Sequence, residues 1–229
     1  MFNCKLEGIE EAKKLLSPER IKKVLLNAIN DTARVDVKKD IIDEMKNVFD
    51  RPTPYTLNSV YTKLNTSDMS VEIGLKEWGG KGRSAAEYLK PQIFGGSRPM
   101  KRSESYLQSY YVPGSGVRLN AYGNIPGSTI TQILSALKAF PEVGYMANVT
   151  ARSKGKNKRI RNFFIIKERG KGLKPGVYEG TSNGVKPILI FIGSPSYQVR
   201  LRWAELIQNS FYKNIQHRFN ESFERAFRA

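Results

Sequence analysis

The groups that most enzymes need are scarce in this chain of 229 residues. It contains one cysteine, Cys4, and one histidine, His217. A single cysteine excludes an internal disulfide bond and fits a reducing compartment. One histidine with one cysteine also excludes the usual spacings of zinc ligands, and no serine or cysteine with a supporting base is indicated. We therefore expect a protein that is not an enzyme and has no metal site, no cofactor and no small-molecule substrate.

Long apolar runs are missing as well. The mean hydropathy is −0.45, and no stretch approaches the roughly 20 residues that span a bilayer. Residues 1–5 lack the apolar stretch of a signal peptide, so we expect synthesis and folding in the cytoplasm without a membrane partner. Residues 79–84, GGKGRS, match neither GxxxxGK[ST] nor GxGxxG, which favours a flexible surface loop over a phosphate-binding loop.

Positive charge, in contrast, is abundant and concentrated. The chain has 38 Lys and Arg against 21 Asp and Glu, a formal net charge of +17. Residues 150–174 hold ten basic side chains and one acidic one, Glu168, whereas the first 72 residues hold twelve of each sign. Clustered cations attract polyanions through counterion release. The alternative is a solvated basic hairpin that only aids solubility.

The first part of this basic stretch alternates charged with other residues. In a strand, alternate side chains project to the same side, and a one-sided row of cations suits a phosphate backbone. No recognition helix or zinc-finger frame is present, so binding should be non-specific and salt-sensitive. The predicted nucleic-acid or polyanion-binding residues are Arg152, Lys154, Lys156, Lys158, Arg159 and Arg161. The alternative is that they grip an acidic neighbouring subunit.

Apolar spacing and helix signals predict a helical first part. Residues 5–16 should form a short helix, and Ser17 and Pro18 then suit the N-cap and first position of another. This second helix is predicted to continue, whole or with a joint near residues 32–36, and to end before Pro52. Beyond it, the sequence predicts a β-hairpin from strands 57–64 and 69–75, then a short helix over 85–89 stopped by Pro91.

The middle of the chain is rich in turn residues and tyrosine. Residues 95–127 are predicted to be an extended, irregular excursion with one helical turn near 103–110. Ser128 is a candidate cap for a helix over 129–140. Strands are predicted at 163–167, 176–179 and 187–192, and the last is apolar on both faces, as in a central strand.

A long helix over residues 200–228 is predicted at the C-terminus. Its apolar residues recur every four positions, so the stripe drifts by about 40° per step. Either the helix wraps a curved sheet or its end docks on another subunit, and we favour the second interpretation. The predicted subunit-interface residues are Tyr106, Tyr110, Tyr111, Tyr122, Phe219, Phe223 and Phe227. The alternative is burial in the protein's own core.

These patterns together predict an α+β fold. Long N-terminal and C-terminal helices should pack on a mixed, mainly antiparallel β-sheet, with long irregular loops. Residues 1–229 are predicted to be a single domain, with loop or hairpin excursions at 78–127 and 150–174.

Several phrases of the sequence resemble proteins of tailed bacteriophages. Ala28-Ile29-Asn30-Asp31-Thr32-Ala33, at the end of an amphipathic helix, resembles the opening of the minor tail protein Z family. Residues 172–179, GLKPGVYE, resemble a phrase of phage neck and tail-completion proteins. Residues 186–192 and the basic, aromatic C-terminal helix fit the same pattern, so the resemblance covers mostly the two ends of the chain.

This resemblance implies a structural protein without catalytic activity. It implies a tail-completion or neck component of the virion, made in the host cytoplasm, that forms a homo-oligomeric ring at the head–tail junction. Its neighbours would be connector, tail terminator or tail tube proteins, with non-specific contact to DNA in the channel. The charge alone supports an alternative, a free-standing non-specific nucleic-acid-binding protein. An enzyme that acts on nucleic acid or cell wall is least supported, because the acid–base groups are missing.

Overall fold

The chain folds into two compact units. The computed structural model describes residues 17–78, 83–140, 148, 150, 161–170 and 172–228. We call residues 1–94 with 199–229 unit 1, and residues 95–198 unit 2. The α+β fold class is confirmed, and each strand pair between described strands is antiparallel. The division concerns compactness and not cooperative unfolding, so the single-domain prediction for residues 1–229 stays a prediction.

Unit 1 begins with a nearly continuous helix in three parts. These are α2 (Pro18–Asp31), the π-helix η1 (Thr32–Val37) and α3 (Lys38–Val48). Ser17 caps α2 as predicted, because its hydroxyl accepts a hydrogen bond from the Arg20 amide at 3.4 Å. The joint predicted near residues 32–36 is the π-helix. The helix predicted over residues 5–16 lies outside the described residues.

A short helix, a β-hairpin and one more helix follow. They are α4 (Pro54–Leu57), β1 (Val60–Asn65), β2 (Ser70–Leu75) and α5 (Ala85–Phe94). The hairpin is confirmed with a shorter first strand. The prediction that Pro91 stops α5 is wrong, because the helix continues for three residues beyond it. Proline removes one helical hydrogen bond, but Pro91 is buried, and the helix ends before Gly95, whose φ is 75°.

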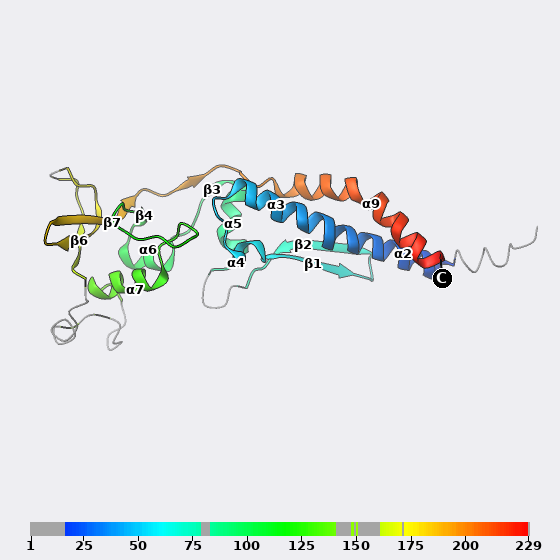
Figure 1. Ribbon diagram of the computed structural model, residues 1–229, viewed down its shortest axis with the longest axis horizontal. Helices are drawn as coiled ribbons and strands as arrows, with labels where there is room; N and C mark the ends of the chain where they lie inside the picture. The colour runs from blue at the N-terminus through cyan, green and yellow to red at the C-terminus, as the bar shows by residue number, and fades with distance from the viewer. Residues whose placement is uncertain are drawn as a thin grey trace, which may run out of the picture. The chain divides into compact units, whose positions relative to one another are not determined.

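The last helix, α9 (Trp203–Phe227), completes unit 1. It runs along α2, η1 and α3, while β1 and β2 lie on the opposite side of those helices (Figure 1). The core of this unit joins Val37, Ile41, Met45, Val60 and Leu201, with the N-terminal half of α9 packed against it. Each large apolar side chain so buried contributes roughly 1.5–3 kcal/mol.

Unit 2 is built on a four-stranded sheet. Its elements are β3 (Gly96–Ser97), α6 (Arg102–Leu107), β4 (Tyr110–Pro113), α7 (Gly127–Ala136), β5 (Phe163–Ile166), β6 (Gly176–Thr181), β7 (Gly184–Ile192) and β8 (Ser196–Tyr197). The strand order is β4-β7-β6-β5, so β7 is central, as its two apolar faces predict. Helices α6 and α7 lie on the same side of the sheet (Figure 1) and pack on its core residues Val177 and Leu189.

Two predictions for unit 2 need correction. Residues 95–127 contain β3, α6 and β4, so the irregular excursion holds more regular structure than one helical turn. Helix α7 begins at Gly127 with Pro126 as its N-cap, so Ser128 is not the cap. It ends at Ala136 instead of 140, and Lys138 beyond it has a φ of 56°. The polar side chain of Ser128 indicated the wrong start, and the helix begins earlier, directly after Pro126, whose ring fixes its φ.

Candidate polyanion interface

Unit 2 carries most of the net charge of the protein. It contains sixteen Lys and Arg against four Asp and Glu, a net charge of +12. Unit 1 contains 22 basic and 17 acidic residues, a net charge of +5, although it is the longer of the two. A surface with few carboxylates keeps a positive field that exposed ion pairs would otherwise cancel. The polyanion interface is therefore to be sought on unit 2.

Arg161 is the one predicted polyanion-binding residue that the structure describes, and it is already paired. Its guanidinium donates to both carboxylate oxygens of Glu179, one at 2.5 Å, and lies over the Phe163 ring at 5.0 Å from the centroid. The Arg161 hydrogen bonds hold the pKa of Glu179 below its ordinary value of 4.5. Arg161 thus ties β5 to β6. Arg152, Lys154, Lys156, Lys158 and Arg159 lie outside the described residues.

A second group of cations lies at the other end of β5, in the connection to β6. Lys167, Arg169 and Lys174 are exposed there, and none has an ion pair within the described part of the chain. The connection closes as a tight turn in which Gly170 and Leu173 exchange backbone hydrogen bonds. Sequence reasoning placed these residues in the basic stretch but not among the binding residues. The two glycines, Gly170 and Gly172, predict a turn and could have located this group of cations at the tip of a hairpin.

Two of the four acidic residues of unit 2 are used internally. Besides Glu179, the side chain of Glu104 is fully buried and accepts both Arg98 NH groups at 2.6 Å and the Lys101 amide at 2.7 Å. Burial by itself raises the pKa of Glu104, but Arg98 and the Lys101 amide outweigh it and hold the pKa below the ordinary value. Arg98 also bonds the Tyr197 hydroxyl on β8. This network joins β3, α6 and β8.

Three of the predicted interface tyrosines have partners inside unit 2. Tyr111 is buried and its hydroxyl lies 2.7 Å from that of Ser103, while the Tyr110 hydroxyl donates to the Arg98 carbonyl at 3.1 Å. The Tyr106 ring meets Phe140 edge-on, 5.8 Å between centroids. Tyr122 is 38% exposed. Burial within the protein, the alternative interpretation, describes Tyr111, whereas Tyr106 and Tyr110 are partly buried. The role of these tyrosines in subunit contacts stays a prediction.

The predicted aromatic residues of the C-terminal helix form a row. Phe219 lies 6.1 Å from Phe223, which lies 4.2 Å from Phe227, between ring centroids. All three are half-buried on α9 of unit 1. Their contact with another subunit stays a prediction.

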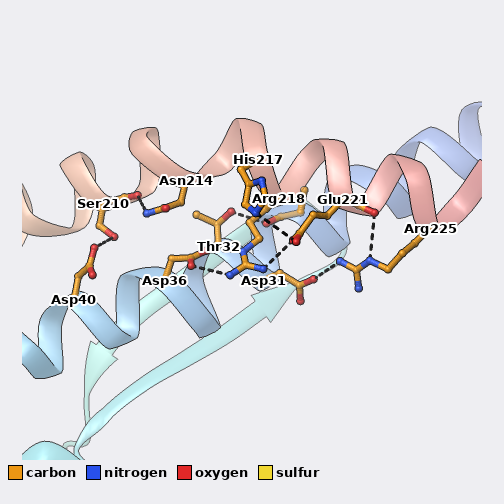
Figure 2. Close-up of polar contacts among 11 residues, drawn as sticks. Asp31, Thr32, Asp36, Asp40, Ser210, Asn214, His217, Arg218, Glu221 and Arg225 are labelled. Atoms are coloured by element: carbon orange, nitrogen blue, oxygen red, sulfur yellow. Dashed lines mark hydrogen bonds and ion pairs between the residues drawn. The ribbon is translucent and has the colours of Figure 1, made fainter.

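The seam between α9 and the N-terminal helices contains a set of polar contacts (Figure 2). Arg218 donates to both carboxylate oxygens of Asp36 at 2.7 and 2.8 Å, and Arg225 reaches Asp31 at 2.9 Å. Two serines complete the seam: Ser210 donates to Asp40 at 2.6 Å, and Ser222 donates to the Val24 carbonyl at 3.0 Å. The hydrogen bonds to Asp36 raise the pKa of the Arg218 guanidinium above its ordinary value. An open depression of about 560 Å³ lies beside these residues, and its charged walls are already ion-paired to one another.

Groups for catalysis or metal binding do not converge in the described part of the chain. The side chain of His217 is 69% exposed on α9 and lies 3.3 Å from Glu221, one helical turn away. Within the described ranges, no group of three or more His, Cys, Asp and Glu side chains could hold a metal ion. Within the same ranges, no helix has both the length and the apolar character to span a membrane. Cys4 lies outside those ranges.

Comparisons with protein-family models, with curated proteins and with solved structures find no match for this chain. The resemblance to phage tail-completion proteins therefore stays a prediction that rests on the sequence phrases described above.

Proposed function

We propose that this protein is a non-catalytic structural protein of a tailed-bacteriophage virion. In this proposal it is a tail-completion or neck component, and copies of it form a ring at the head–tail junction around the DNA channel. Unit 2 faces a polyanion, and unit 1 supplies contacts to neighbouring copies or to connector and tail proteins. The carrying observation is the separation of charge, because unit 2 has a net charge of +12 and the longer unit 1 has a net charge of +5.

The phrases behind the phage resemblance lie in well-formed parts of the fold, which supports the proposal. Ala28, Thr32 and Ala33 of the first phrase are buried where α2 passes into η1. Residues 172–179 form the end of the connection between β5 and β6 and most of β6. A phrase that specifies buried helix contacts or a turn is constrained by packing, so it can persist where surface residues vary.

Electron cryomicroscopy of native particles that contain this chain tests the proposal most directly. We expect density for a closed ring at the head–tail junction, with unit 2 toward the channel. A ring of identical subunits needs a heterologous contact that closes by rotation. Absence of the protein from purified particles would contradict the structural role. A ring with unit 2 turned away from the channel would keep the role and reject the DNA-facing orientation.

The charge of unit 2 also favours a second candidate, a free-standing non-specific nucleic-acid-binding protein. The two candidates differ in what the isolated chain does. The free-standing binder is a monomer that binds DNA tightly and with a steep dependence on salt. The virion protein binds weakly as a monomer and gains avidity on assembly, because several subunits then contact one duplex. Sedimentation of the protein with and without DNA separates them.

A further inference from the structure

We propose that Lys167, Arg169 and Lys174, at the tip of the β5–β6 hairpin, bind the phosphate backbone of double-stranded DNA. This inference rests on the proposed contact of unit 2 with a polyanion and assigns that contact to specific residues. The three described cations of the hairpin are Lys167, Arg169 and Lys174, and all three are exposed.

The backbone of the hairpin tip is a defined turn. The Leu173 amide donates to the Gly170 carbonyl at 2.9 Å, and the Gly170 amide donates back to the Leu173 carbonyl at 3.3 Å. Gly172 has a φ of 79°, a conformation that glycine adopts without strain. The turn therefore holds the flanking cations on a short, closed scaffold.

The second limb of the hairpin is anchored to the sheet. The hydroxyl of the buried Tyr178 donates to the Lys174 carbonyl at 2.8 Å, and the Phe191 amide of β7 donates to the Pro175 carbonyl at 2.9 Å. The first limb has one residue more, since Ile166 faces Gly176 while Gly170 faces Leu173. An extra residue of this kind bends a strand and re-aims its side chains. An anchored scaffold loses less backbone entropy on binding than a free loop does.

The charges at the hairpin tip are available, unlike the charge at the other end of β5. Glu168 is the one acidic residue of the segment, and it is exposed and forms no ion pair with another described residue. Arg161, about 20 Å away along the extended strand, is neutralised by Glu179. The basic stretch of the sequence is therefore divided in space. Its described unpaired cations, which can displace counterions from a phosphate backbone, lie at the hairpin tip.

The test compares two triple variants of the full-length chain. K167A/R169A/K174A removes the three hairpin cations, and R20A/K22A/K23A removes the same number and types of exposed cation from α2 of unit 1. Binding to a short fluorescent duplex is measured by anisotropy over a series of salt concentrations. We expect the slope of log K against log salt concentration to be smaller in magnitude for the hairpin variant by roughly two to three. Each lost phosphate contact lowers the magnitude of that slope by about 0.9. The control should leave the slope close to that of the wild type.

The outcomes separate this inference from the proposed function. If the wild type binds DNA and both variants lose the same amount, the site at the hairpin tip is rejected, while binding of DNA by the protein as a whole survives. If the wild type does not bind DNA even at the lowest salt concentration of the series, where weak monomer binding is strongest, the proposed contact fails and the site fails with it. A polyglutamate competitor identifies an acidic protein partner: tighter binding of polyglutamate than of DNA, lost in the hairpin variant, would overturn the assignment to DNA. Circular dichroism of each variant confirms that it is folded.

Discussion

Units 1 and 2 use their charged residues in opposite ways. In unit 1 the two signs are nearly balanced, and Arg218 and Arg225 of α9 are paired with Asp36 and Asp31 across the helix seam. In unit 2 the cations outnumber the carboxylates fourfold, and of the described carboxylates only Glu168 is free of a basic partner. The difference teaches that the net charge of a segment does not locate a binding surface. Only the fold shows which of those charges are already paired, as Arg161 is with Glu179.

The largest expected effect comes from breaking the buried ion pair of unit 2. Glu104→Ala leaves the guanidinium of Arg98, only 11% exposed, without its carboxylate. Removing one partner of a buried pair costs about 3–5 kcal/mol. Both tryptophans, Trp78 and Trp203, lie in unit 1, so their fluorescence reports on that unit alone. We expect the unfolding midpoint measured by far-ultraviolet circular dichroism to move to a lower denaturant concentration. The midpoint measured by tryptophan fluorescence should stay where it is in the wild type.

The control for this variant is Glu168→Ala, which removes an exposed carboxylate without a described ion pair. It should change the unfolding midpoint by little, as exposed substitutions do. If tryptophan fluorescence and circular dichroism shift together in Glu104→Ala, the two units unfold as one cooperative domain, and the single-domain prediction for residues 1–229 gains its support.

A packing change in the sheet of unit 2 should have the next largest effect. A Cβ on Gly176 would lie 2.2 Å from the Leu189 carbonyl oxygen and 3.2 Å from the Ile190 Cα, so Gly176→Ala forces β6 and β7 apart. Overpacking of this kind costs about 1–3 kcal/mol. Gly193→Ala is the matched control, because no atom lies within 4 Å of its Cβ position. Equal denaturant midpoints for the two variants would contradict the close approach of the strands.

A smaller effect is expected from the helix seam of unit 1. Asp36→Asn removes the charge that Arg218 contacts, where both side chains are about one-fifth exposed. We expect a loss of about 1–2 kcal/mol, between the values for exposed and for buried pairs. Asp43→Asn on the neighbouring α3 breaks a pair with Lys46 in which both side chains are about half exposed, and should cost under about 0.5 kcal/mol. Denaturant unfolding followed by Trp203 fluorescence measures the free energy of unfolding of both variants. An equal loss of stability in Asp43→Asn and Asp36→Asn would reject the seam as a specific contact.

The smallest expected effect is a dependence on pH that belongs to unit 2. The pKa values of Glu104 and Glu179 are held below 4.5 in the folded state, so their contribution to stability is present above that pH and is lost as pH falls through the folded values. The unfolding midpoint of unit 2 should therefore fall on acidification below about pH 4.5. Glu179→Gln should flatten this dependence and cost no more than about 1 kcal/mol, because its partner Arg161 is partly exposed. An unchanged pH profile would show that the pair with Arg161 contributes nothing.

Local signals predicted most of the elements of the fold. Ser17 and Pro18 placed the start of α2, and the alternation of Met69, Val71, Ile73 and Leu75 indicated β2. The two apolar faces of residues 188–192 indicated a central strand, which β7 is. The short elements α4, β3, β4 and β8 were missed, and some boundaries were misplaced. Pro91 was predicted to stop a helix that continues through it, because the burial of its ring in the packed unit outweighs one missing hydrogen bond.

The candidate site was predicted less well than the fold. The sequence located the basic stretch, but Arg161 in it is neutralised by Glu179, eighteen residues away, while Lys167, Arg169 and Lys174 were passed over. The tyrosines predicted for an interface include Tyr111, which is buried in unit 2. Whether a cation is paired or an aromatic side chain is buried depends on tertiary contacts, which local sequence patterns do not show.

The sequence by itself determined the α+β class, the long terminal helices, the central strand and the excess of positive charge. These follow from periodicity, capping and composition, which act over one turn of helix or a few residues of strand. The tertiary structure alone decided the division into two units, the polar seam of α9, and which cations stay unpaired. These depend on which carboxylate and which guanidinium meet in space, and contacts such as Asp36 with Arg218 join residues that the sequence keeps far apart.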